Sequence, residues 1–124
     1  MTDVTAKKLE DVPAYEGPRA IPGIRFRSLG RALGVSAWGM NAIEIDPGCT
    51  AYPEHDHAKD GQEEVYVVLE GSGTIAAAGG ETKLEPGMLV RVGASVKRKV
   101  QPGPDGIVLL VLGATPGQPF RPRS

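Results

Sequence analysis

The chain has 124 residues, of which 14 are basic and 15 are acidic, and its net charge is −1. This length suits one domain with a real core but not two, and the balanced charge favours neither a nucleic acid nor an anionic membrane as a partner. The single cysteine, Cys49, allows no disulfide within the chain, and no apolar run approaches the roughly 18 residues of a spanning helix. We therefore expect a soluble, cytoplasmic protein.

Short apolar runs interrupted by 17 glycines and 11 prolines are typical of an all-β domain. Residues 1–20 are predicted to form an irregular arm, 21–114 the folded domain and 115–124 an irregular tail. Strands are predicted over residues 24–29, 36–45, 64–70, 74–78, 81–84, 88–92, 95–100 and 107–112. Turns are predicted near residues 30–34, 46–48, 71–73, 79–80 and 86–87. Many short strands separated by turns favour a small antiparallel β-barrel or a double-sheet jelly roll.

Both histidines of the chain lie two residues apart, at His55 and His57. Side chains two apart in an extended segment project from the same face, so the two imidazoles can bind one ion. A carboxylate from the next strand, Glu64, would complete a set of two histidines and one carboxylate. This set suits a divalent iron, manganese, zinc or nickel ion and leaves coordination positions open.

This stretch resembles the first signature of the cupin superfamily, which has a glycine, an H-x-H pair, a glutamate and a second glycine. The matching positions are Gly48, His55, His57, Glu64 and Gly71. Two of the intervals are one or two residues longer than usual, and both are loops. The resemblance implies a small single-domain β-barrel that holds its metal, when present, inside the barrel on these side chains.

The second cupin signature is mostly lost in this chain. Counting from Gly87, Arg98 takes the place of the third histidine ligand, and a guanidinium has donors only, so it cannot bind a metal. Alternation puts Arg98 on the same face as Val96 and Val100, which predicts that it points into the barrel. A buried arginine needs an acidic partner, and Glu64 is the nearest candidate, with Glu63 less favoured.

Glu63 and Glu64 are adjacent, so only one of them can face the interior. With Glu64 inward, Tyr66 and Val68 share its face. The opposite face is apolar enough to need a cover and consists of Val65, Val67 and Leu69. The sequence therefore predicts a homodimer, while Tyr66 either orients a substrate through its hydroxyl or fills the core.

These residues support two main interpretations of function. In the first, the chain is a metalloenzyme (a dioxygenase, isomerase or lyase) whose metal is held by His55, His57 and Glu64, while Arg98 or Tyr66 binds a small acidic or enolic substrate. In the second, it is a metal-free, non-catalytic module that recognises a small anion through Arg98. If Arg98 is only the counter-ion of Glu64, it replaces the charge of the metal and leaves the two histidines as hydrogen-bonding residues of the pocket. A third interpretation is a structural or regulatory dimer whose pocket is vestigial. The pattern does not decide the reaction type.

Overall fold

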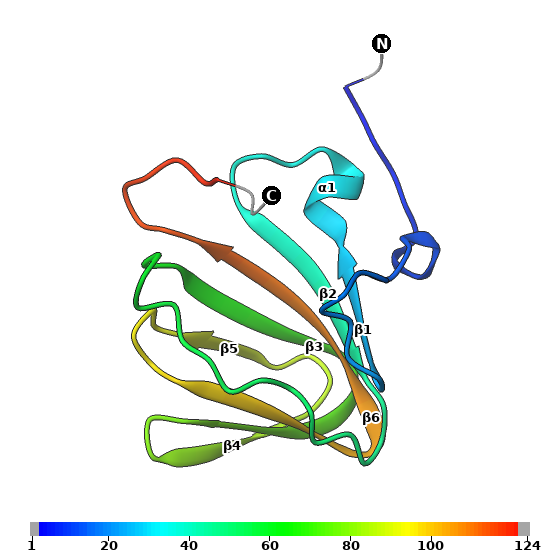
Figure 1. Ribbon diagram of the computed structural model, residues 1–124, viewed down its shortest axis with the longest axis vertical. Coiled ribbons are helices and arrows are strands. Elements are labelled where there is room, and N and C mark those ends of the chain that lie inside the picture. The colour runs from blue at the N-terminus through cyan, green and yellow to red at the C-terminus, as the bar shows by residue number, and fades with distance from the viewer. Residues whose placement is uncertain (1–2, 122–124) are drawn as a thin grey trace.

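A computed structural model describes residues 3–121 and shows a curved antiparallel sheet with the strand order β1-β2-β6-β3-β4 and with β5 paired to β3. Figure 1 shows β1 and β2 on one side of the molecule and β4 and β5 on the other. The strands are β1 (Ile24–Ser28), β2 (Gly39–Ile45), β3 (Glu63–Ala77), β4 (Gly80–Leu84), β5 (Leu89–Val92) and β6 (Arg98–Ala114). The predicted all-β jelly roll is confirmed.

The two long strands β3 and β6 pair along most of their length and form the centre of the sheet. Irregularities between Val68 and Glu70 and between Gly71 and Gly73 break the register, and such bulges bend and twist a strand. The first half of β3 pairs with β5 and its second half with β4. The sheet therefore wraps around a core instead of staying flat.

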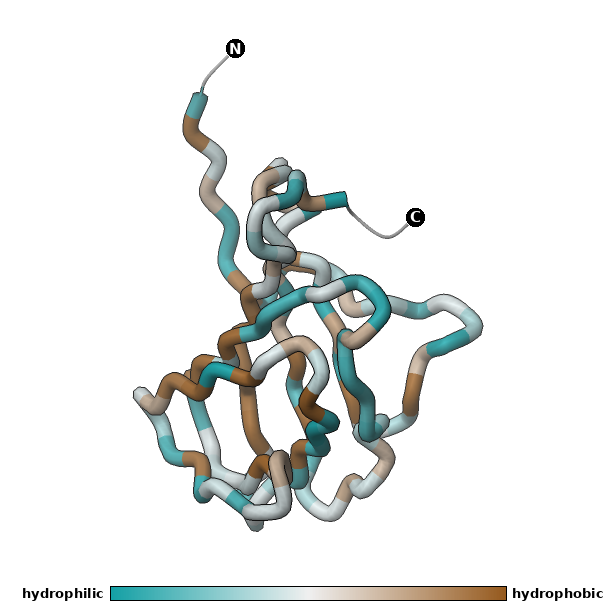
Figure 2. The backbone as a smooth tube through the Cα atoms, turned by 90° about the vertical axis from the view of Figure 1, so that its left-hand side faces the viewer, coloured by the Kyte–Doolittle hydropathy of each residue, from teal (hydrophilic) through white to brown (hydrophobic). Residues whose placement is uncertain are grey.

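The core fills the inside of this curved sheet, and apolar stretches follow its strands (Figure 2). It includes Ile43, Ile45, Tyr66, Val68, Ile75, Leu84, Val100, Leu109 and Val111. A smaller cluster lies on the other face of β2, where Ala42 packs with Val12 of the arm and with Leu29 of the short helix α1 (Leu29–Leu33). The arm also contains a 3-10 helix (Leu9–Asp11) and is tied to β1 by the bond from Arg27 Nη1 to the Val12 carbonyl, 2.5 Å long.

Several predicted boundaries are wrong. The turn predicted at 71–73 and the break between 95–100 and 107–112 are absent, because bulged strands continue through them. The turn predicted at 30–34 is helix α1, which ends at Gly34 with φ of 80°. His55 and His57 lie in a loop and not in a strand, since His55 makes only one isolated bridge, to Arg98. Residues 122–124 of the predicted tail lie outside the described residues.

The register predicted for β3 is confirmed. Tyr66 and Val68 are both 1% exposed, whereas Leu69 is 40% exposed on the outer face. Leu89 of β5 lies on the same outer face and is 70% exposed. Within residues 3–121, no helix has the length and apolar character needed to cross a membrane.

The homodimer stays a prediction, and the outer face of β3 and β5 is where it can be tested. Leu89→Lys should convert a dimer into a monomer, because it places a charge in the centre of the apolar face, and sedimentation velocity would measure this. Val4→Lys, at an 80% exposed position in the arm, should leave the assembly unchanged. A wild-type protein that is monomeric at all concentrations would contradict the prediction.

Candidate metal centre

The structure brings the three predicted metal ligands together. His55 and His57 come from the loop between β2 and β3, and Glu64 comes from the inner face of β3. One ligand atom from each lies within 4.8 Å of the other two. His57 Nε2 is 3.4 Å from Glu64 Oε2, and His55 Nε2 is 4.0 Å from Glu64 Oε1. The side chain of His55 is 35% exposed and that of Glu64 is 13% exposed, so the site is reached from the side of His55.

Backbone hydrogen bonds position the two histidines although their segment is not a strand. His55 exchanges two bonds with Arg98, one of 3.1 Å and one of 2.9 Å, and the amide of His57 donates to the carbonyl of Ala94 at 2.7 Å. These bonds hold the loop along the start of β6. They give His55 and His57 the common direction that the sequence assigned to an extended segment.

Each imidazole is held through its Nδ1 atom, which leaves Nε2 for a metal. His55 Nδ1 lies 3.0 Å from the carbonyl of Pro53, and because a carbonyl only accepts, Nδ1 carries the proton. His57 Nδ1 lies 3.1 Å from Asp60 Oδ2 and takes the same tautomer. A ligating histidine is commonly oriented through its second nitrogen in this way.

The donor set fits a divalent ion. His57 Nε2 is buried and has no hydrogen-bond partner within the described residues, and a buried polar atom without a partner is costly unless something binds it. Bonds of about 2.0–2.2 Å to one ion would bring two ligand atoms to roughly 3.0–3.5 Å from each other. The 3.4 Å between His57 Nε2 and Glu64 Oε2 already lies in that range, and the three ligand atoms lie within 4.8 Å of one another.

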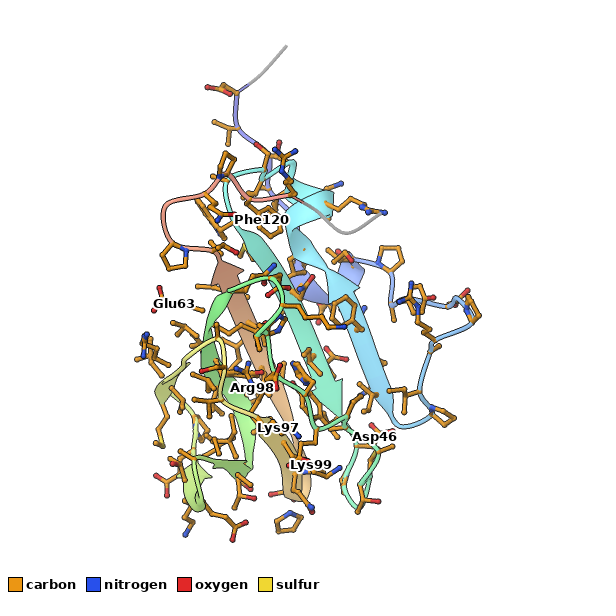
Figure 3. All side chains as sticks on the ribbon, turned by 60° about the vertical axis from the view of Figure 1, so that its left-hand side comes forward. Asp46, Glu63, Lys97, Arg98, Lys99 and Phe120 are labelled. Carbon is orange, nitrogen blue, oxygen red and sulfur yellow. The ribbon has the colours of Figure 1, made fainter. Side chains whose placement is uncertain are left out.

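Arg98 lies behind Glu64 and is 0% exposed; Figure 3 shows it among the strands. Its Nη1 donates to Glu64 Oε1 at 2.6 Å, its Nε to the carbonyl of Val96 at 3.0 Å and its Nη2 to the carbonyl of Gly93 at 2.9 Å. Glu63 points outward and pairs with Arg91, so Glu64 is the carboxylate that compensates the buried charge.

Two tyrosines extend this network. The Tyr66 hydroxyl donates to Glu64 Oε1 at 2.9 Å and lies 3.2 Å from the hydroxyl of Tyr52. Burial raises the pKa of Tyr52 to about 12 and raises the pKa of Tyr66 further. Both phenols are therefore neutral at physiological pH. Because Arg98 and Tyr66 occupy Oε1, Oε2 is the oxygen of Glu64 that is left for an ion.

The assignment of Arg98 and Tyr66 as substrate contacts stays a prediction. Their exposed fractions, 0% and 1%, favour the alternative in which they hold Glu64 in place. The sequence reasoning missed Asp60 and Tyr52, which orient His57 and Tyr66. The three-residue spacing between His57 and Asp60 was a usable signal for Asp60, since it is typical of a side chain folding back over a turn.

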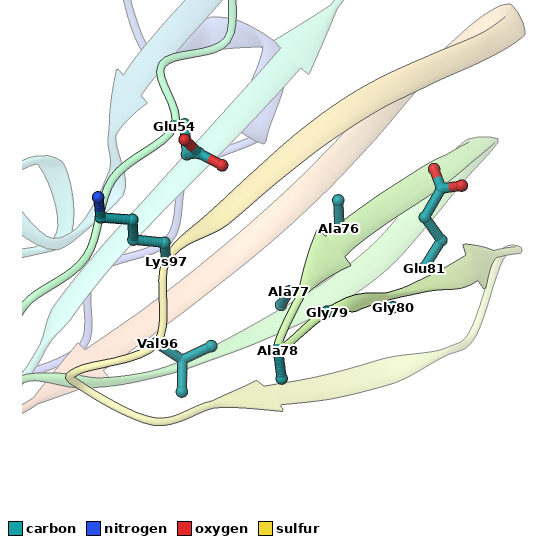
Figure 4. Close-up of a pocket in the computed structure, with 9 residues that line it drawn as sticks. All are labelled: Glu54, Ala76, Ala77, Ala78, Gly79, Gly80, Glu81, Val96 and Lys97. Atoms are coloured by element: carbon teal, nitrogen blue, oxygen red, sulfur yellow. The ribbon is translucent and has the colours of Figure 1, made fainter.

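Two hollows lie outside the ligand set. One, of about 570 Å³, lies beside the turn between β3 and β4 and is lined mainly by small residues together with Glu54, Glu81 and Lys97 (Figure 4). The other, of about 620 Å³, lies between residues 58–62 and residues 115–121. His55, His57 and Glu64 line neither of them, although the second begins next to His57 in the chain.

The model of the cupin domain family matches residues 41–112, which is more than half of the chain. Together with the fold and the cluster of two histidines and one glutamate, this match shows that the chain belongs to the cupin family. A search of curated proteins found no match.

Solved structures agree with this assignment. A cupin protein from Bacteroides fragilis is 18% identical with a TM-score of 0.73, over 100% of this chain and 93% of that one. A sugar phosphate isomerase of the cupin superfamily from Silicibacter pomeroyi is 22% identical with a TM-score of 0.75, over 89% and 75%. A candidate sugar phosphate isomerase from Acidithiobacillus ferrooxidans is 30% identical with a TM-score of 0.60, over 73% of this chain and 58% of that one.

Removing the guanidinium should destabilise the metal-free protein. Arg98→Met strands the Glu64 carboxylate and should lower the free energy of unfolding by about 3–5 kcal/mol, measured by urea denaturation in the presence of a chelator. The double variant Arg98→Met/Glu64→Gln should recover part of that loss, because no uncompensated charge is left. A single variant as stable as the wild type would show that the pair is not needed.

The tyrosines predict the behaviour of the protein at high pH. Tyr52 and Tyr66 should not ionise until about pH 12 or above, well beyond the value near 10 that is usual for a tyrosine. Because folding raises the pKa of both phenols, their neutral forms stabilise the folded protein. This stabilisation is complete below pH 10 and is lost as the pH rises through about 12. A titration of near-ultraviolet absorbance should show that two of the three tyrosines are still neutral at about pH 11. Three equivalent ionisations near pH 10 in the folded protein would contradict this network.

Proposed function

We propose that this cupin is a metalloenzyme that binds one divalent ion on His55, His57 and Glu64 and acts on a small acidic or enolic organic substrate. The observation that carries the proposal is the buried Nε2 of His57. It has no hydrogen-bond partner within residues 3–121 and faces Glu64, while Nδ1 is held by Asp60. An imidazole oriented from behind, with its other nitrogen directed at a carboxylate, is the usual form of a metal ligand.

The charges of the site favour an anionic substrate. Arg98 neutralises Glu64, so the two positive charges of a bound ion would stay uncompensated. A histidine ligand in place of Arg98 would leave only one. An enolate, a carboxylate or a phosphate would balance this excess in a site of low polarity. This preference agrees with the two structural neighbours that are named for sugar phosphate isomerisation.

The residues of the chain have distinct parts in this proposal. A bound ion would supply Lewis-acid polarisation of a substrate oxygen and, if it is iron, oxygen activation. Three protein ligands leave positions open for a substrate to chelate. Pro53 and Asp60 hold the tautomers of the histidines, and Arg98 and Tyr66 hold Glu64 in one rotamer. Whether the reaction is an isomerisation, a lyase reaction or an oxygenation depends on the substrate.

The second candidate function is a metal-free module that binds a small anion. The observation that favours it is the guanidinium of Arg98, each of whose three nitrogens donates a hydrogen bond inside the protein, because it compensates Glu64 without a metal. In that state, His55 and His57 would contact the anion beside Arg98. We also propose the cytoplasmic location that the sequence predicts.

Metal content distinguishes the two functions. Elemental mass spectrometry on protein purified without a tag or added metal should find close to one transition metal per subunit, and both His55→Ala and His57→Ala should remove it. Asp60→Ala should weaken metal binding by about 10–100-fold, since it releases His57 without removing a ligand. Lys59→Ala, at the exposed neighbouring position, is the matched control. Metal far below one per subunit, with no gain on reconstitution, would support the anion-binding module.

A further inference from the structure

A pair of glycines interrupts the inner face of the sheet beside the proposed metal centre. Gly39 of β2 pairs with Gly113 of β6, and Gly113 pairs in turn with Glu64 of β3. Alternation places these residues on the same face as Ile43, Leu109 and Val68 of the core. On this side of Glu64, β6 and β2 therefore contribute no side chain of their own to the row, whereas β5 on the other side contributes Val92.

Two side chains from other parts of the chain occupy the space that the glycines leave. A Cβ atom on Gly39 would lie 3.2 Å from the ring of Phe120, and a Cβ atom on Gly113 would lie 3.1 Å from Gln62 Oε1 and 3.3 Å from Glu64 Cγ. Phe120 thus covers Gly39, and the amide of Gln62 lies over Gly113 beside Glu64. Figure 3 shows Phe120 at the end of the molecule where the tail turns back toward β2.

Both side chains line the 620 Å³ groove between residues 58–62 and residues 115–121. Its volume lies within the roughly 300–1,000 Å³ of small-molecule sites. Its lining starts at the residue after His57 and includes Gln62, and the Gln62 amide lies with Glu64 beside Gly113, so the groove adjoins the residue that supplies the carboxylate ligand. We call it the tail groove.

Asp60 connects the tail groove to the metal centre. Its carboxylate accepts bonds from His57 Nδ1 and from the amide of Gln62, and its carbonyl accepts the Thr115 hydroxyl at 2.8 Å. A single residue thus orients a ligand histidine, places Gln62 and anchors the start of the tail. A movement of the tail would therefore be transmitted to the metal centre through hydrogen bonds on Asp60.

We propose that the tail groove receives the far end of a substrate whose acidic group binds at His55, His57 and Glu64, and that Gln62 and Phe120 determine which substrates fit. This inference rests on the proposed function. The part of the chain that matches the cupin family is residues 41–112, so Gly39 and Phe120 lie outside it. The tail groove is accordingly a property of this chain that the family match does not supply.

The lining of the tail groove defines the chemistry of that far end. Lys59 and Arg121 contribute positive charges, and Gln62 and Gln118 contribute amides that both donate and accept hydrogen bonds. Asp60, the acidic residue of the lining, is engaged with His57. Phe120 offers one apolar surface. This composition selects a hydroxylated chain that ends in an anionic group over a purely apolar one.

Two probes with the same chelating head test the proposal. Glycolate is a 2-hydroxy acid without a chain, and 6-phosphogluconate adds a hydroxylated chain that ends in a phosphate. Calorimetric titration of the zinc-loaded protein should show tighter binding of 6-phosphogluconate. Gln62→Ala and Phe120→Ala should each weaken that binding by about tenfold, which is the equivalent of one or two hydrogen bonds or contacts, and should leave glycolate binding unchanged.

Matched controls and an independent readout complete the test. Gln101→Ala and Tyr15→Ala change exposed residues of the same types outside the tail groove and should bind both probes as the wild type does. Gly39→Val should act like Phe120→Ala, because its side chain displaces the ring without changing the tail. Hydrogen exchange at the backbone amides of residues 115–121 should slow with 6-phosphogluconate and not with glycolate.

Equal weakening of both probes, no weakening of either, or a wild type that binds 6-phosphogluconate no more tightly than glycolate would each overturn the proposal. Zinc titration of the wild type reports on the proposed function separately. If no zinc binds, the metalloenzyme is ruled out, and the 6-phosphogluconate titration is then made on the metal-free protein. In that case, binding of 6-phosphogluconate that is lost in Gln62→Ala would still support the tail groove as a binding site. No binding of 6-phosphogluconate to the metal-free wild type would overturn the proposal.

Discussion

The buried guanidinium of Arg98 is the constraint on which the rest of the site depends. A charge with no exposed surface must find acceptors inside the protein or it destabilises the fold. Its four partners are the carbonyls of Gly93 and Val96, the carboxylate of Glu64 and the hydroxyl of Tyr66. By holding Oε1 of Glu64, Arg98 leaves Oε2 directed at His57. The residue that cannot bind a metal thus determines how the carboxylate ligand is presented.

The loop between β2 and β3 provides the other half of the site without regular secondary structure. Its backbone is bonded to residues 94 and 98, and Pro53 and Asp60 orient the two imidazoles. The same Asp60 accepts hydrogen bonds from the amide of Gln62 and the hydroxyl of Thr115. The geometry of the metal centre and the shape of the neighbouring groove are therefore coupled through a few bonds, in a segment where side chains can change without disturbing the barrel core.

Strand register was predictable from the sequence, and strand continuity was not. The alternation around Glu64 and around Arg98 assigned both residues correctly to the interior, because a one-residue slip would have buried Glu63 or Lys97. The same glycines that indicate turns also permit bulges. Gly71 and Gly73 were predicted to end a strand, yet β3 continues through them because β6 pairs with it on both sides. The residues around Gly71 and Gly73 do not by themselves indicate that β6 pairs with β3 on both sides of them.

The sequence by itself determined the all-β class, the cupin resemblance and the inward direction of Arg98, and it indicated that His55, His57 and Glu64 come together. All of these follow from residue types and from the two-residue period of an extended chain. Only the tertiary structure decided that Arg98 is paired and buried, that Asp60 orients His57, and that Phe120 and Gln62 meet over the glycine pair beside Glu64. These contacts join residues up to several tens of positions apart, so they depend on the curvature of the sheet and on where the tail returns, neither of which a local pattern encodes.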